Sequence, residues 1–487
     1  MPKSRFFLLV SCIFLLATGV SCFFDIAVFY AYLADKIIFL WPLFLFSIVL
    51  CFKNKYFFVV AILVLVILRL FYFTSSEAQI NNFQFGKNYD FSSVVLDRDK
   101  ALDGWTYVVE PTDDIFVGRI LLKSSLYPDY QINDLLKINC FIYKPEPIAL
   151  TGKNTFYYDK YLAKDKIFYR CAQARISKIG HQNNWADFVN RGRNFFMGNI
   201  NKLPEPSGAF AKAVILGNQK EVPKYLVNQF SRTGLTHIIS ISGLHMVIII
   251  WLMYALLGTL GLYRQQVFIF LFLALLAYLY LIGFISPALR SSAMILLALL
   301  GPIIKRQTFS LYSVIFLVDL FVLTNPYFLL FDISFQLSFL AVFGLIFYSN
   351  FFNQIFRKIG NTFKIRETLA VTSAAQVFTW PLTAYYFTNM SLIAAVANFL
   401  ALPLFPFILV LTILLAIFGA VPILGQIFLW PLDLLLRAMF KIMEILAHFK
   451  YAALSITGFD WQFLTLSFSI VILITILLKP QKYEAPD

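Results

Sequence analysis

Long apolar runs alternate with short polar segments over most of this chain. Apolar runs of about eighteen residues or more predict membrane-spanning helices, because that length crosses the hydrocarbon core of a bilayer. The pattern predicts a polytopic α-helical integral membrane protein of roughly ten to twelve spans, some broken or re-entrant. The expected runs are 6–24, 37–52, 56–73, 238–260, 266–285, 288–304, 309–325, 334–349, 368–388, 391–418, 424–447 and 463–479.

The first run could also be interpreted as a signal peptide. A second apolar run follows closely and no A-x-A cleavage pattern appears, so we expect a retained helix. Basic residues in short loops remain cytoplasmic. The N-terminus with Lys3 and Arg5 and the loop with Lys53 and Lys55 are therefore expected on the cytoplasmic side, so the third helix crosses the membrane from inside to outside. Segment 74–235 is then extracytoplasmic. The later basic loops also fall on the cytoplasmic side in this topology. They contain Arg264, Lys305, Arg306, the cluster 357–366, Lys479 and Lys482.

The polar segment divides into two parts. Short β-prone runs at 91–96, 105–109, 115–122, 135–143 and 167–172 are separated by turn residues, and five such strands suit an OB-like barrel. Such a barrel could bind oligonucleotides or merely brace the membrane domain. Residues 185–230 alternate aromatic and aliphatic with basic positions, which is typical of a helix in the membrane interface or of one packed in the outer domain.

These patterns give five expected units. They are N-terminal transmembrane helices at 1–73, an extracytoplasmic OB-like β domain at 74–180, amphipathic or interfacial helices at 181–235, a multi-helix membrane domain at 236–479 and a cytoplasmic tail at 480–487.

Composition strengthens the membrane assignment. The chain is 60% hydrophobic and only 14% charged, against about 25% charged in soluble domains, which excludes an ordinary soluble protein. Its net charge of +14 fits cytoplasmic loop charge, and it permits a polyanionic partner without showing one.

The cysteines and histidines predict no metal site and no cofactor. No C-x-x-C occurs and the histidines form no cluster with metal-ligand spacing. Cys140 and Cys171 lie in two separate expected strands of the outer domain, where the compartment permits disulfides. We expect them to form a disulfide, the alternative being two buried thiols.

The most distinctive stretch is SRTGLTHIISISGLHM, residues 231–246, which leads into an apolar run. Polar groups at the edge of a bilayer need protein or water partners. The candidate groups span about 200° on a helix, so Gly234 and Gly243 could mark a break that turns them towards a cavity. They could line a gate, pack structurally, or form a Ser–His catalytic pair, although no orienting acid lies nearby in sequence. The candidates are His237, Ser240, Ser242, Gly243 and His245.

Further polar residues occur inside later runs. One helix carries a polar stripe within about 60°, made of Thr372, Gln376, Thr379 and Thr383. This stripe could form the wall of a conduit or make polar contacts between helices. Intramembrane charge is costly and is usually paired or functional, so we consider an Arg290–Asp332 pair or an Arg290 that draws phosphate inward.

Asp332 and Gln336, four positions apart, are expected to share a helix face. Prolines interrupt the later helices, either around a transport site or as packed kinks.

Several stretches together resemble the ComEC competence family. LTHIISISGLHMVII is similar to its most recognisable motif, and the approach AVILGNQKEVPKYLVNQFSRTG also matches. Further likeness lies in SPALRSSAMILLALL, NPYFLLFDISFQLSFLAVFGL and WPLTAYYFTNMSLIAAVANFLALPLFP. YQINDLLKINCFIY and YYDKYLAKDKIFYRCAQARI resemble the OB-like outer domain of that family.

The resemblance implies an inner-membrane channel of a bacterium that passes single-stranded DNA into the cytoplasm during natural transformation. It also implies a DNA receptor, a nuclease and a cytoplasmic DNA-handling motor as separate proteins. Many members continue into a metallo-β-lactamase-like domain whose H-x-H-x-D-H cluster is missing from this sequence, and no Walker A motif occurs. We therefore expect no enzyme activity. The alternatives are an intramembrane Ser/His hydrolase and a transporter of another anionic substrate.

Overall fold

The computed structural model describes residues 83–478 except for gaps at 102–103, 114, 150–154, 183–184, 305–310, 360–364, 388 and 457–458, together with residues 11, 14, 15, 18 and 80. The expected spans at 6–24, 37–52 and 56–73 lie outside this region apart from isolated positions. The expected tail at 480–487 also lies outside the described residues.

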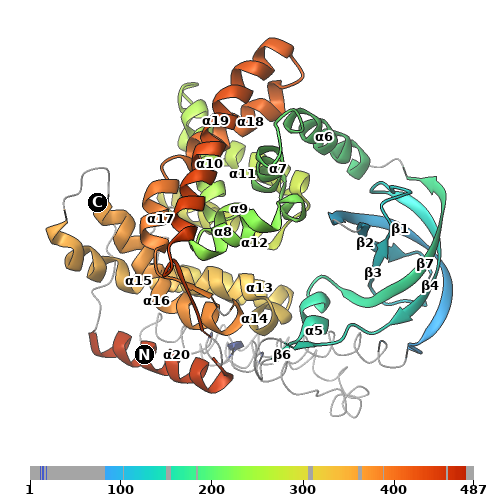
Figure 1. The fold of residues 1–487 in the computed structure, drawn as a ribbon, viewed down its shortest axis with the longest axis horizontal. Coiled ribbons are helices and arrows are strands. Elements are labelled where there is room, and N and C mark those ends of the chain that lie inside the picture. The colour runs from blue at the N-terminus through green and yellow to red at the C-terminus, as the bar shows by residue number, and fades with distance from the viewer. Residues whose placement is uncertain are drawn as a thin grey trace, which may run out of the picture.

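Five strands close into a barrel at one end of the molecule (Figure 1). They are β1 (Lys87–Ala101), β2 (Gly104–Pro111), β3 (Arg119–Ser124), β4 (Asp134–Tyr143) and β7 (Ile167–His181). Around the barrel the order is β1-β2-β3-β7-β4, and β4 pairs with β1 to close it. Only the β3–β7 pair is parallel among these five strands.

Alternating side chains explain why these segments form strands. Along β4, every second residue from Asp134 to Ile142 is buried, so one face lines the barrel interior and the other faces outward. The five expected strands are confirmed, and most extend further than expected. The third was predicted to begin too early, because Gly118 at φ +92° turns the chain against the backbone of Lys166 and the ring of Phe168, directly before β3.

A connection between β4 and β7 reaches from the barrel to the helices. It contains β5 (Ile148–Ala149), β6 (Thr155–Phe156) and α5 (Tyr158–Ala163), and α5 lies between the barrel and α14 (Figure 1). In the two barrel strands that flank the connection, Cys140 of β4 and Cys171 of β7 form a disulfide, with their Cα atoms 5.8 Å apart.

Three helices follow the barrel: α6 (Trp185–Ile200), α7 (Ser207–Leu216) and α8 (Lys224–Arg232). Residues 185–230 were expected to form either a helix in the membrane interface or a helix packed in the domain, and the structure contains one helix with the features of each kind. All ten residues of α7 are buried, as in a core helix. On α6, in contrast, Trp185, Phe188 and Phe195 are exposed, as expected of a helix with an outward apolar face.

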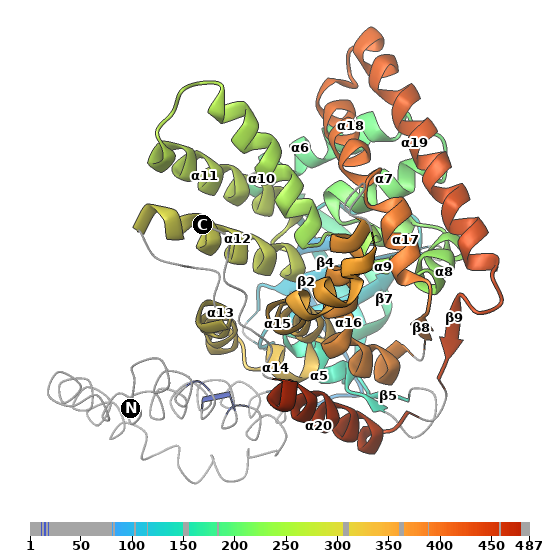
Figure 2. The same cartoon turned by 90° about the vertical axis from the view of Figure 1, so that its left-hand side faces the viewer.

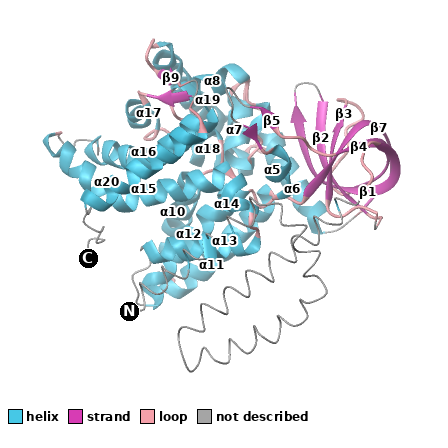
Figure 3. Ribbon diagram, turned by 90° about the horizontal axis from the view of Figure 1, so that it is seen from below, coloured by secondary structure: helices cyan, strands magenta, loops and turns pink. Residues whose placement is uncertain are grey.

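The remaining helices form a bundle (Figures 2 and 3). In chain order they are α9 (Thr236–Ile239), α10 (Gly243–Gly258), α11 (Arg264–Ile282), α12 (Ser286–Ile304), α13 (Leu311–Thr324), α14 (Tyr327–Phe331), α15 (Ile333–Ile355), α16 (Ile365–Phe387), α17 (Ala394–Ala401), α18 (Phe405–Phe418), α19 (Pro422–His448) and α20 (Trp461–Leu478). A short β8–β9 pair, Asn389–Ser391 with Ala453–Ser455, ties the ends of α16 and α19 together.

The helices coincide with the expected apolar runs to within a few residues. Among the described residues, three are long and apolar enough to cross a membrane, namely Arg264–Ile282, Ile333–Lys358 and Pro422–His448. A fourth is added if α17 and α18, bent by 48°, count as one broken span. The protein is therefore a mostly helical membrane protein, and the larger number of spans stays a prediction.

Candidate functional site

The distinctive Ser/His stretch forms the break between α9 and α10. Backbone torsions become extended at Ser240 and Ser242, so the helix stops after Ile239 and restarts at Gly243. Gly234 turns the chain at φ +76°, where a Cβ would press on Ser391 and Ala394. The expected broken helix is confirmed, and it leaves polar groups at the helix ends rather than along one stripe.

Ser242 and His245 form a tight pair at the start of α10. The Oγ atom of Ser242 lies 3.0 Å from Nδ1 of His245, which also accepts the backbone N–H of Ser242 at 3.1 Å. The arrangement is a capping box, in which each residue satisfies an otherwise unpaired group of the helix end. His245 is buried against the ring of Phe405, and its Nε2 contacts no hydrogen-bond partner among the described residues.

The other residues of the stretch lie nearer the surface. His237 is exposed on the short helix α9, and the Ser240 hydroxyl donates a long 3.4 Å bond to the His237 carbonyl. The structure thus does not bring His237 and His245 to one hydroxyl group.

Arg290 and Asp332 meet where α12 approaches the start of α15. Both side chains are almost fully buried, with Arg290 Nη1 3.8 Å from Asp332 Oδ2. Arg290 also donates to Ser286 Oγ at 2.6 Å and to Ser334 Oγ at 2.8 Å. Its Nε has no hydrogen-bond partner in the described part of the chain.

Asp332 has two structural tasks. Its Oδ1 accepts the backbone N–H groups of Ser334 and Phe335, so it caps the N-terminus of α15. Its Oδ2 faces Arg290 and, at 3.4 Å, Nζ of Lys164 from the end of α5. Two buried cations therefore share one carboxylate at the contact between barrel and bundle.

Sequence reasoning missed Lys164. No apolar period or motif distinguishes the segment around it, and its partner lies 168 positions away by numbering, 332 − 164. The backbone carbonyl of Lys164 also accepts a 2.7 Å bond from Asn325 Nδ2, so the same residue meets the bundle twice. Burial alone would lower the pKa of Lys164, but the carboxylate of Asp332 raises it above its ordinary value.

The expectation that Asp332 and Gln336 share a helix face is wrong. Asp332 lies at the cap, before the first helical residue, with φ −99° and ψ 96°. The Gln336 side chain instead turns back to donate to the carbonyls of Leu329 and Leu330, each at 2.9 Å. It therefore satisfies the last turn of α14.

The four polar residues of α16 do not form one open stripe. Thr372 is buried and accepts a 3.2 Å bond from Asn398 of α17, as expected of polar contacts between helices. Thr379 and Thr383 donate to carbonyls of their own helix, at Ala375 and Trp380. Gln376 is exposed.

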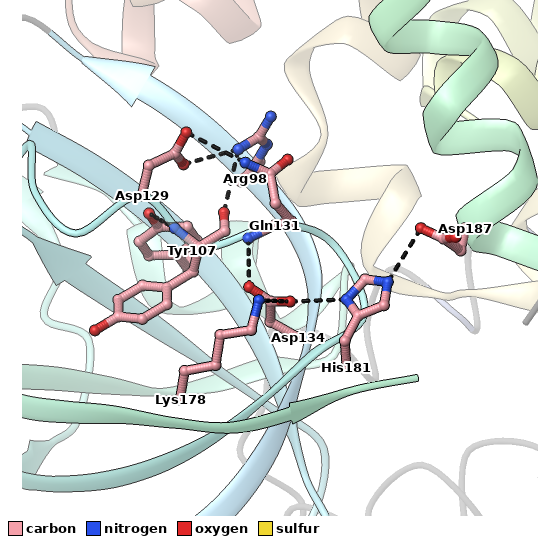
Figure 4. Close-up of polar contacts among 9 residues, drawn as sticks. Arg98, Tyr107, Asp129, Gln131, Asp134, Lys178, His181 and Asp187 are labelled. Carbon is pink, nitrogen blue, oxygen red and sulfur yellow. Dashed lines mark hydrogen bonds and ion pairs between the residues drawn. The ribbon is translucent and has the colours of Figure 1, made fainter. Parts of the chain in front are cut away.

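A second polar cluster joins the barrel to α6 (Figure 4). Asp134, buried in the first position of β4, contacts Lys178 at 2.5 Å and His181 Nδ1 at 2.8 Å. The other ring nitrogen of His181 faces Asp187 of α6 at 3.2 Å. Only the protonated imidazole ring carries N–H groups for both carboxylates.

Burial by itself would raise the pKa of Asp134. Hydrogen bonds from Lys178, from the backbone N–H of Gln131 and from His181 outweigh that effect, and the pKa of Asp134 lies below its ordinary value. The cluster thus contains an ionised carboxylate in the folded barrel at neutral pH.

The described residues contain no group of three or more His, Cys, Asp or Glu side chains placed to hold a metal ion.

Comparison with known proteins places the chain in a family. The model of the family described as "Competence protein" matches residues 214–481, more than half of the chain. "ComE operon protein 3" of Bacillus subtilis (strain 168) is 25% identical over 376 residues, which cover 76% of this chain and 47% of the relative. "Recombination protein 2" of Haemophilus influenzae is 26% identical over 239 residues, covering 45% of this chain and 29% of the relative.

The chain thus spans less than half the length of either curated relative. No solved structure matches it. The matched region begins within α7 and includes the α9–α10 break, the Arg290–Asp332 contact and the helices that follow. The chain therefore belongs to the ComEC family of competence proteins.

Proposed function

We propose that this protein serves DNA uptake, as a membrane conduit that carries single-stranded DNA into the cytoplasm during natural transformation. The observation that carries the proposal is the match of the competence family to residues 214–481, which contain nearly the whole helical bundle. One relative is named for a competence-type operon and the other for recombination, and both names agree with a role in acquiring DNA.

The physical requirements of that task agree with the site. A DNA strand is densely anionic, so it needs a hydrated path with cationic groups and cannot enter hydrocarbon. Broken helices at α9–α10 and α17–α18 place non-helical backbone inside the bundle, which membrane proteins tolerate where it lines a cavity or is buried in protein. Arg290 and Lys164 both face the carboxylate of Asp332, so two cationic side chains lie where the barrel meets the bundle.

In this proposal the barrel is an OB-type domain that receives the strand outside the cytoplasmic membrane. Its five strands close with one parallel pair, as suits a small Greek-key barrel. In this proposal residues 74–235 are extracytoplasmic and the multi-pass protein lies in a bacterial inner membrane, and the basic residues of the short loops support that orientation. A disulfide in the barrel suits that compartment.

The chain acts here without catalysis, and its partners are single-stranded DNA and the lipid bilayer. Other proteins supply the DNA receptor, the nuclease and the cytoplasmic motor. Deletion of the gene, followed by labelled donor DNA, tests the proposal. Transfer of label into the cytoplasm should be lost while DNA bound outside is retained, and unchanged transfer would refute it.

The Ser242–His245 pair favours one alternative, an intramembrane hydrolase. A serine hydroxyl 3.0 Å from a histidine nitrogen has the spacing of a nucleophile and its base. A serine-directed covalent probe separates the two. Labelling that disappears in Ser242→Ala, with loss of uptake after labelling, would support the hydrolase over the passive conduit. Uptake of another anion, with no DNA transfer, would support a different transporter.

A further inference from the structure

The outward faces of β4 and β7 carry aromatic and basic side chains in matched rows. The register pairs Tyr143 with Arg170, Phe141 with Ala172 and Asn139 with Arg175, so each pair lies on one face of the sheet. Phe141 and Arg175 are exposed, whereas Tyr143 and Arg170 are half-buried. The two arginine rows are four positions apart along β4, a span of about 13 Å.

Arg170 occupies the centre of this surface. Its guanidinium carbon lies 5.1 Å from the ring centre of Tyr143 and 5.8 Å from that of Tyr158 on α5, so two tyrosine rings flank it. Within the described residues, no carboxylate lies within ion-pair distance of Arg170 or Arg175. By contrast, Arg98 pairs with Asp129, Arg119 with Glu110 and Lys137 with Asp90.

The aromatic rows continue along α5 to the bundle. The rings of Tyr158 and Tyr161 are nearly parallel, with centres 6.3 Å apart, and Nζ of Lys164 lies 4.0 Å from the Tyr161 ring centre. Lys164 then meets Asp332 at the start of α15. These side chains therefore follow α5, which lies between the barrel and α14 of the bundle (Figure 1).

We name this surface the arginine–tyrosine strip and define it as Phe141, Tyr143, Tyr158, Tyr161, Arg170 and Arg175. Internal packing accounts for part of α5, since Tyr157 contacts Phe331 and Phe156 contacts Tyr386 of the bundle. The ring of Phe156 also lies beside those of Tyr158 and Tyr161, so one side of these two strip residues is part of that packing. Asp90 of β1, which lies opposite Asn139 of β4, pairs with Lys137 at 3.7 Å.

We propose that the arginine–tyrosine strip binds single-stranded DNA, with bases stacked on its aromatic rings and phosphates on Arg170 and Arg175, and directs the strand along α5 to the bundle. This inference rests on the proposed function and deepens it. Aromatic rings accept any base because every base has a flat π face. Unpaired arginines bind phosphate through two parallel hydrogen bonds, which a paired arginine cannot offer.

The test uses the full chain in phosphatidylcholine nanodiscs with two fluorescent probes. One is an oligothymidylate, and the other is an abasic strand of equal length with the same phosphates and no bases. The variants are Tyr143→Leu with Tyr158→Leu, and Arg170→Gln. Matched controls are Tyr127→Leu, an exposed tyrosine on a barrel loop, and Arg119→Gln, a paired arginine of the same barrel.

The wild-type protein should bind the base-bearing strand at least about fivefold more tightly than the abasic strand, because stacking adds to phosphate contacts. The double tyrosine variant should lose that preference. Arg170→Gln should weaken the binding of both DNA strands. It should also remove about one phosphate contact, which changes the slope of log K against log salt concentration by ~0.7. Both controls should behave as wild type, and matching melting temperatures show that each variant is folded.

Two results would contradict the proposal that the strip binds single-stranded DNA. The double tyrosine variant could retain the wild-type preference for bases, or Tyr127→Leu could lose it equally. Such results leave the conduit standing as long as the wild-type protein binds the strand and gene deletion abolishes uptake. Conversely, normal DNA uptake in the deletion strain refutes the conduit. DNA binding by the strip is still supported in that case if the wild-type protein prefers the base-bearing strand and only the strip variants lose this preference.

Discussion

Lys164 at the end of α5 and Asp332 at the start of α15 form a buried ion pair, with Nζ and Oδ2 3.4 Å apart. The pair joins the barrel to the helical bundle, because α5 belongs to the connection between two barrel strands. Arg290 shares the same carboxylate from α12. A single side chain thus fixes three elements that are distant in sequence.

Asp332→Ala should therefore destabilise the protein strongly. The substitution leaves two buried cations without a counter-charge and removes the cap of α15, and breaking a buried pair costs about 3–5 kcal/mol. Thermal unfolding in detergent measures the effect. Lys137→Gln, which removes a partner from an exposed pair of the barrel, should change stability by less than about 1 kcal/mol. Equal effects of the two substitutions would contradict the central place of Asp332.

Arg290→Gln should leave the protein folded but reduce DNA uptake about tenfold or more. Asp332 keeps Lys164 as its counter-charge, so its carboxylate is not left unpaired. A cationic group that favours an anionic strand is lost. Transfer of labelled DNA, normalised to the amount of protein in the membrane, measures this. Arg290→Lys serves as the control that retains the charge, and unchanged uptake in Arg290→Gln would rule out a role for this arginine in transfer.

The barrel should lose stability in acid through Asp134. Its pKa is below the ordinary value in the folded state, so its ionised form stabilises the fold at neutral pH. That contribution is fully present above the unfolded pKa of about 4 and is lost as the pH falls through the lower folded value. Hydrogen exchange of β4 and β7 peptides, corrected for intrinsic rates, should show opening below pH 4. Asp134→Asn should weaken protection at pH 7 and remove most of this acid dependence.

Reduction of Cys140–Cys171 should also destabilise the barrel. The bond links residues separated by 31 positions, and loops of this size give a stabilisation of about 3–4 kcal/mol. Peptide mapping without reductant should find the two cysteines in one linked pair. The unfolding temperature of the wild type should drop with reductant, whereas that of a Cys140→Ala, Cys171→Ala variant should not respond. Two free thiols in the mapped protein would refute the bond.

Aqueous access should differ between neighbouring polar positions. In a background with Cys12, Cys22 and Cys51 replaced, a cysteine at Gln376 should react with a membrane-impermeant thiol reagent, because in the proposed conduit this exposed glutamine faces water and not lipid. A cysteine at Thr372, covered by Asn398, should react slowly. Protection of both sites, together with sites 236–245, in every condition would remove the support for a hydrated passage there.

The sequence predicts regular elements better than contacts. Alternation and apolar length suffice for the five strands and the helices, because those patterns follow from local geometry. Asp332 was misplaced within a helix, although an Asp directly before an apolar run is also a helix-cap signal. Lys164 and the His181–Asp187 contact had no such signal, since tertiary packing alone brings these residues together.

Closure of the barrel restricts how other proteins can dock on it. Each strand pairs with two neighbours, with β4 bonded to both β1 and β7. The pairing of β3 with β7 ends at Cys171, so the rest of β7 pairs with β4 alone. A partner strand can therefore extend this sheet only along a stretch of that kind. Elsewhere on the barrel, a protein that delivers DNA would have to recognise side chains, and substitutions on the barrel surface should be able to separate its docking from folding.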